Sequence, residues 1–131
     1  MIVTTDSILQ GNSPVCGIIC LYAVMRHWNP TISYEAVLQS IEAPFYSGTT
    51  KELVRIAQKF NLNANVYKLS VKTLFALPPP FIIHWDNNHY VVYEGVEGEK
   101  VYINDPLVGH TTVTKDSIIN HYTGYALLVY Q

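Results

Sequence analysis

The stretch CGIICLYAVM occupies residues 16–25, so a long apolar segment opens with Cys16. Its apolar side chains recur at three- and four-residue spacing as far as Trp28, which predicts a helix from about residue 15 to residue 28. A proline two residues later ends this segment, because proline cannot continue a helix. Cys16 is therefore expected in the first turn of the helix.

A cysteine in this position is placed where a thiolate is favoured. The first turn of a helix has backbone N–H groups without partners and carries about half a positive charge, and both lower the pKa of a thiol. Taken alone, a cysteine in an apolar helix is more often a small core residue, and that interpretation suits Cys20 better than Cys16. The two cysteines point along one side of the helix, where disulfide geometry is poor, and unpaired cysteines suit a reducing compartment.

The rest of the first half also reads as helical. One helix is predicted from the N-cap Ser33 to about residue 44, and another follows Gly48, where Thr49 and Glu52 form a capping box. The second half reads mostly as strands, at residues 64–69, 81–85, 89–95, 100–104 and 125–130, with brief helices at 71–77 and 114–122. Helices followed by an antiparallel sheet predict an α+β fold, here as a single domain over residues 1–131.

The composition limits the classes of function. The chain is 49% hydrophobic and 14% charged, which predicts a globular protein, and a net charge of −2 without a basic run argues against a nucleic-acid partner. There is no secretory signal, and no apolar run approaches the roughly 18 residues that span a bilayer, so we expect no membrane insertion and a cytoplasmic location. The ten tyrosines fit a peptide groove or half-buried strands, of which the second is favoured.

The strands at residues 89–95 and 100–104 are predicted to form a hairpin through the turn at residues 96–99. A side chain with catalytic chemistry stands at the open end of each strand. His89 starts the first strand and Asp105 follows the second, so pairing of the strands brings both side chains to one edge of the sheet. The helix that begins at Cys16 can dock at this edge, and Gln10 can turn its amide toward the same place. Each residue alone is weak evidence, but together they supply the thiol, base, orienting carboxylate and oxyanion donor of a cysteine protease.

The remaining histidines do not suggest a metal site. His84 and His89 are five residues apart across a turn, which is not a common zinc spacing, and the chain has no Cys-x-x-Cys or His-x-x-x-His motif. His110 and His121 are isolated and are predicted to be surface or structural residues. We expect neither a metal nor a cofactor.

At these residues the chain resembles the double-glycine leader peptidases, the papain-like cysteine protease domains that process bacteriocin and related peptide precursors. The matching segments are Gln10 with residues 16–21, residues 80–85 with 89–92, residues 101–106 with Gly109, and residues 122–127. The resemblance implies a papain-like fold with N-terminal helices packed on a C-terminal antiparallel sheet. It also implies that Cys16 is the nucleophile, His89 the general base and acid, Asp105 the orienting carboxylate and Gln10 the oxyanion amide.

The same resemblance implies a function. Such a domain is a cysteine endopeptidase that cuts a leader peptide after a Gly-Gly pair, and it usually forms the N-terminal cytosolic part of a peptidase-containing ABC transporter. A peptide with a Gly-Gly leader and an ABC transporter are therefore the implied partners, and the chain is either such a domain or a free-standing relative. The acidic residue that often precedes the cysteine is Val15 here. Two alternatives stay open: a non-catalytic leader-binding domain, and a papain-like transpeptidase or amide-transferring enzyme.

Overall fold

A computed structural model of the chain describes residues 1–9, 16–41, 50–86 and 89–131. Three helices come first: α1 (Cys16–Trp28), α2 (Tyr34–Gln39) and α3 (Thr50–Lys59). They are followed by β1 (Asn63–Lys68), α4 (Val71–Ala76), β2 (Phe81–Trp85), β3 (His89–Glu97), β4 (Lys100–Asp105), β5 (Gly109–Thr114), α5 (Lys115–His121) and β6 (Tyr122–Tyr130). None of the helices in these ranges is long and apolar enough to cross a membrane.

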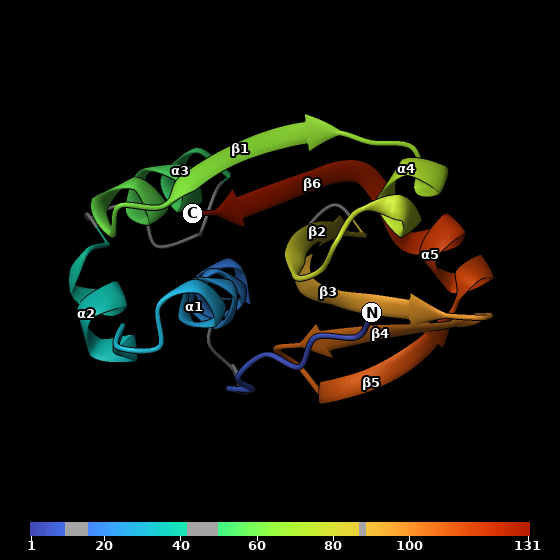
Figure 1. Cartoon of the computed structure of the whole chain (residues 1–131), viewed down its shortest axis with the longest axis horizontal. Coiled ribbons are helices and arrows are strands. Elements are labelled where there is room, and N and C mark those ends of the chain that lie inside the picture. Colours follow the sequence, from blue (N-terminus) through green and yellow to red (C-terminus); the bar gives the residue numbers. More distant parts are fainter. Residues whose placement is uncertain (10–15, 42–49, 87–88) are drawn as a thin grey trace.

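The strands form one antiparallel sheet in the order β1-β6-β2-β3-β4-β5. Helices α1, α2 and α3 lie on one side of this sheet and α4 and α5 on the other, and the sheet curves round α1 (Figure 1). The central strands β2 and β3 therefore have packed residues on both faces. The predicted order of helices first and antiparallel sheet second is confirmed.

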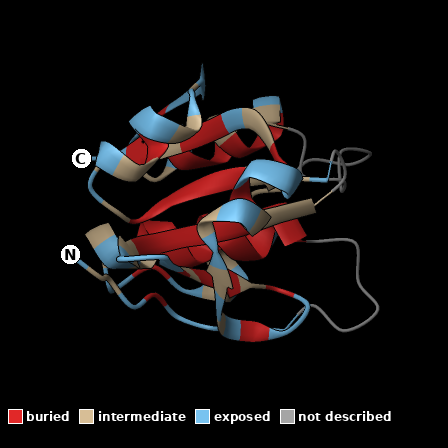
Figure 2. Ribbon diagram, turned by 90° about the vertical axis from the view of Figure 1, so that its right-hand side faces the viewer, coloured by how far each residue is buried: buried red, intermediate tan, exposed pale blue. Residues whose placement is uncertain are grey.

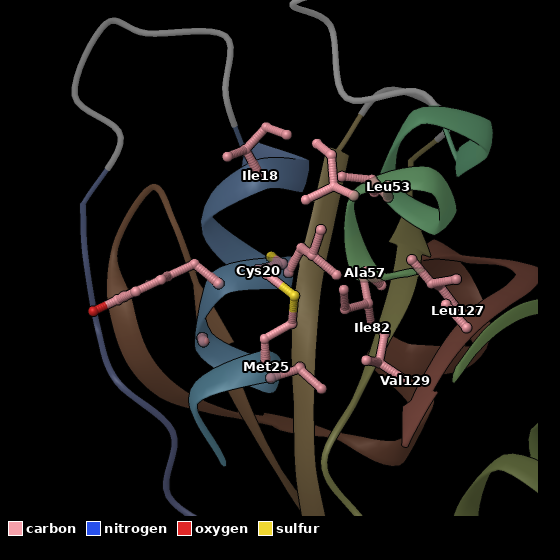
Figure 3. Close-up of a cluster of buried hydrophobic side chains, with 14 of the residues drawn as sticks. Ile18, Cys20, Met25, Leu53, Ala57, Ile82, Leu127 and Val129 are labelled. Carbon is pink, nitrogen blue, oxygen red and sulfur yellow. The ribbon is translucent and has the colours of Figure 1, made fainter. Parts of the chain in front are cut away.

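Side chains on alternate positions of the strands fill two separate cores, as the period of two along a strand requires. On β2, Ile82 packs with the helix α1 cluster, whereas Phe81 and Ile83 belong to the cluster on the other face. Figure 3 shows the first cluster, in which side chains of α1, α3, β2 and β6 point toward one another. All ten residues from Cys16 to Met25 are buried, so α1 is enclosed on every side over most of its length. Figure 2 shows that buried residues fill the interior of the molecule and exposed ones its outer surface.

Local signals in the sequence predicted several element boundaries correctly. The Ser33 and Thr114 hydroxyls cap α2 and α5 by accepting from the backbone N–H three residues on. The helix expected to reach residue 44 ends at Gln39, because the Ser40 amide and hydroxyl bond back to carbonyls of its last turn. Thr49 lies outside the described residues.

Two predicted strand boundaries were wrong, and one strand was missed. Strand β3 continues to Glu97, β6 begins at Tyr122, and the edge strand β5 was not predicted at all. The sequence of β5, GHTTVT, has one large apolar side chain and alternates between partly buried and exposed positions over its last five residues. An edge strand of this kind lacks the hydrophobic alternation from which strands are predicted.

A buried polar network ties the N-terminal segment to the sheet. Glu94 is 3% exposed, and one of its carboxylate oxygens accepts from the backbone N–H of Thr5 at 2.6 Å and from the Thr5 hydroxyl at 2.8 Å. Its other oxygen lies 3.0 Å from Nδ1 of His110. The Asn104 amide donates to the Thr5 hydroxyl oxygen at 2.9 Å and to the Asp6 carbonyl at 2.8 Å. Strands β3 and β4 thus hold the segment that precedes α1, and His110 of β5 bonds to the carboxylate that binds it.

We predict that Glu94→Gln lowers the free energy of unfolding by about 1–3 kcal/mol, because an amide replaces a carboxylate that accepts from buried donors. The matched control is Glu97→Gln, at an exposed position of the same strand, which should change stability by less than about 0.5 kcal/mol. Urea unfolding of both variants measures the difference. Equal losses in the two variants would contradict a special role for the buried carboxylate.

Candidate active site

Cys16 is the first residue of α1 and is 8% exposed. Burial raises the pKa of its thiol, but a hydrogen bond with the His89 ring, backbone hydrogen bonds from Tyr90 and Gly17, and the charge of His89 together hold it below its usual value near 9. The amide of Gly17 belongs to the first turn of α1, where N–H groups have no partner within the helix. The expectation that the helix start favours a thiolate agrees with this environment.

His89 begins β3, and its Nε2 lies 2.7 Å from Oδ1 of Asp105, the last residue of β4. The hydrogen bond with Asp105, and next the one with Cys16, raise the pKa of His89 to about 9. Because Nε2 faces the carboxylate, the nitrogen left for Cys16 is Nδ1. The imidazole therefore stands between a thiol and a carboxylate and is favoured in its protonated form.

Asp105 is held by the turn that follows it. The same Oδ1 accepts from the backbone N–H of Leu107 at 2.9 Å, and the Asp105 carbonyl accepts from the N–H of Val108 at 3.1 Å. Burial raises the pKa of the carboxyl, but the His89 ring and the Leu107 amide hold it below its usual value. The carboxylate is thus ionised and oriented before any substrate arrives.

Cys20, one turn further along α1, has a different environment. It is 1% exposed, and burial raises the pKa of its thiol well above the usual value. Its S–H donates to the Tyr90 carbonyl at 3.3 Å, so the backbone of Tyr90 contacts both cysteines. Neither cysteine is in a disulfide, and Cys20 is the buried structural cysteine that the sequence predicted.

Gln10 lies outside the described residues, so its role as an oxyanion donor stays a prediction. His110 and His121 were predicted to be surface or structural residues, and both lie at the surface: the first bonds to Glu94, and Nδ1 of the second lies 2.7 Å from Oδ1 of Asp86. Within residues 1–9, 16–41, 50–86 and 89–131, no group of three or more His, Cys, Asp and Glu side chains is placed to hold a metal ion.

An open hollow of about 310 Å³ lies on the side of the sheet that faces α1, and one of its lining residues, Tyr90, directly follows His89 in β3. It is lined by residues of α3, β1, β2, β3 and β6, namely Thr50, Val66, His84, Tyr90 and Tyr125. From the sequence, His84 was considered only as a possible zinc ligand, and the other four residues were given no individual role. The only signal was the large number of tyrosines, for which a groove was the less favoured interpretation.

The molecule has the fold of known proteases. A double glycine motif protease from an AMS/PCAT transporter, solved in complex with the leader peptide, matches with a TM-score of 0.89 at 25% identity, over 98% of this chain and 93% of that one. The peptidase domain of ComA from Streptococcus matches with a TM-score of 0.82 at 25% identity, over 94% and 96%. These matches confirm the α+β, papain-like fold and show that the chain is similar to peptidase domains.

The chain belongs to the Peptidase C39 family, which matches residues 4–131. Its curated relatives include the colicin V secretion/processing ATP-binding protein CvaB of Escherichia coli, at 25% identity over 92% of this chain. Another is the mesentericin-Y105 transport/processing ATP-binding protein MesD of Leuconostoc mesenteroides, at 29% identity over 95% of this chain. The chain spans only 17% and 18% of the length of these two proteins. The resemblance found in the sequence is therefore confirmed.

We predict that iodoacetamide labels Cys16 but not Cys20 in the folded protein, with a pH midpoint below 9. Asp105→Asn replaces the carboxylate that raises the pKa of His89 by a neutral amide, so less imidazolium remains and the pKa of Cys16 rises. Labelling near neutral pH should then slow by about tenfold for each unit of that rise. Mass spectrometry of time points at several pH values measures both effects, and labelling with an unchanged midpoint in Asp105→Asn would contradict the coupling.

Proposed function

We propose that this chain is a cysteine endopeptidase that cleaves a leader peptide after a Gly-Gly pair. Cys16 is the nucleophile, His89 the general base and acid, and Asp105 the group that orients the imidazole. The observation that carries the proposal is the position of His89, which bonds to both Cys16 and Asp105 where β3 begins and β4 ends. Membership of the Peptidase C39 family supports it.

The reaction follows from these positions. The proton of the Cys16 thiol passes to Nδ1 of His89, and the thiolate attacks the carbonyl carbon of the second glycine. The Gln10 amide and the backbone N–H of Cys16 bind the oxyanion of the tetrahedral intermediate. The imidazolium protonates the leaving amine, the C–N bond breaks, and a thioester remains on Cys16. His89 then takes a proton from water, the hydroxide attacks the thioester, and the leader is released as a carboxylate.

Asp105 contributes to this cycle without exchanging a proton. Its Oδ1 fixes the tautomer in which Nε2 carries a proton, so that Nδ1 is free to accept the proton of the thiol. The negative charge then stabilises the imidazolium that forms. The Leu107 amide keeps this oxygen in place during both transfers.

We propose that the hollow lined by His84 and Tyr90 receives the end of the leader. A solved relative that shares this fold is described as bound to the leader peptide, and the curated relatives are transport and processing ATP-binding proteins. The natural substrate is then the precursor of a bacteriocin-like or other secreted peptide. The working partner is an ABC transporter, with this chain as one peptidase domain at its cytosolic face.

We predict that the protein cuts a synthetic leader-end peptide after Gly-Gly and that Cys16→Ala abolishes cleavage. Replacing the second glycine by valine should also abolish cleavage, and Gln10→Ala should lower kcat by about 10²–10³. Liquid chromatography with mass spectrometry of the fragments identifies the bond that is cut.

The same assay distinguishes the two alternatives. Leader binding by both the parent and Cys16→Ala, without cleavage by either, would show a binding domain and overturn the proposal. Cleavage with the leader recovered on an added amine in place of water would show a transferase.

A further inference from the structure

His84 lines the hollow together with Tyr90, and its ring and its carbonyl both contact the Thr123 hydroxyl. Nδ1 lies 2.9 Å from the Thr123 hydroxyl oxygen, and that hydroxyl donates to the His84 carbonyl at 3.3 Å. The hydroxyl is placed to donate its single proton to the His84 carbonyl, and in that arrangement its oxygen accepts from Nδ1–H. The neutral ring therefore carries its proton on Nδ1, and Nε2 is left as a hydrogen-bond acceptor.

This acceptor has no protein partner among the residues that the structure describes. The recorded contacts of the His84 ring are Thr123 and the Tyr90 ring, whose centroid is 5.0 Å away. The other side chains around the hollow belong to Thr50, Val66 and Tyr125, from three further elements. A half-buried imidazole nitrogen in an open hollow of this kind is suited to accept from a ligand N–H.

The pairing of β2 with β3 places His84 a short distance along the sheet from His89, and so from the bond that is cut. His84 is opposite Tyr90 in the β2–β3 register, and Tyr90 follows His89 directly. Neighbouring strands are about 4.8 Å apart and an extended chain advances about 3.3 Å per residue, so a peptide passes from His89 to His84 within roughly two or three residues. A leader end that lies in the hollow brings its backbone past the acceptor.

We propose that Nε2 of His84 accepts a hydrogen bond from a backbone N–H of the leader, within the few residues before the scissile bond. This inference rests on the proposed function and adds a substrate-binding residue to it. An N–H buried in the hollow without a partner costs free energy, and His84 removes that cost without contacting a substrate side chain. Because the bond is present both before and during the chemical step, it lowers KM and leaves kcat unchanged.

The experiment pairs variants of His84 with N-methylated peptides, because methylation deletes one backbone N–H at a time. Each of the four leader residues before the scissile bond is methylated in turn. Binding of a fluorescent peptide is measured in the Cys16→Ala background, with and without His84→Leu. We expect methylation at one position to weaken binding by about 2- to 10-fold, and His84→Leu to weaken the unmodified peptide by a similar factor. Combined, the two changes should weaken binding no further than either alone.

Two further variants separate this role from a packing role. His84→Gln keeps an acceptor oxygen and should bind the peptide within about twofold of the parent. Thr123→Val removes the hydroxyl that holds the proton on Nδ1 of His84, and it should weaken binding less than His84→Leu does. Each variant is also made in the protein that keeps Cys16, and its rate of Cys16 alkylation is measured first. An unchanged rate shows that Cys16 and His89 are intact, and kcat should then equal that of the parent.

Independent effects of His84→Leu and of methylation at every position would overturn the inference, as would unchanged binding in His84→Leu. Because binding is measured on Cys16→Ala, the result does not depend on cleavage. Coupled binding in a protein whose Cys16 form cuts no Gly-Gly peptide would support the role of His84 and overturn the proposed endopeptidase. Cleavage of the Gly-Gly peptide without coupling between His84→Leu and methylation would support the endopeptidase and overturn the role of His84.

Discussion

The hydrogen bond between Nε2 of His89 and Oδ1 of Asp105 is the interaction on which the site depends. It forms only if β3 and β4 pair in one register, and if the turn after Asp105 presents its carboxylate inward with the help of the Leu107 amide. The bond then directs Nδ1 of His89 toward the start of α1. A thiol that would be an ordinary buried group elsewhere meets an imidazole that is already oriented.

The second requirement is that α1 meets the sheet in one position. Its Trp28 indole donates to the Val129 carbonyl of β6 at 2.8 Å, and its Cys20 thiol donates to the Tyr90 carbonyl of β3 at 3.3 Å. Burial of the residues from Cys16 to Met25 also stabilises this packing through the hydrophobic effect, which is not directional. The directional hydrogen bonds and the closely packed cluster together place Cys16 beside His89 at the start of β3.

The extent to which the sequence predicted this arrangement depended on how local each feature is. A hairpin is a local structure, so His89 and Asp105 were paired correctly, and the caps at Ser33 and Thr114 were recognised from single hydroxyls. The hollow was not predicted, because its five wall residues come from five elements that only tertiary packing brings together. The role of Gln10 rests on spacing and resemblance, since it lies outside the described residues.

The ionisation of His89 tests the pairing most directly, and ¹⁵N NMR of a protein labelled at histidine measures it through a pH titration. If the thiolate and the carboxylate hold the imidazolium between them, His89 stays protonated until the pH passes through about 9. Removing the charge of either partner, in Cys16→Ala or Asp105→Asn, should then lower that midpoint. A midpoint near 6.5 in the unaltered protein, equal to that of an isolated histidine, would contradict the pairing.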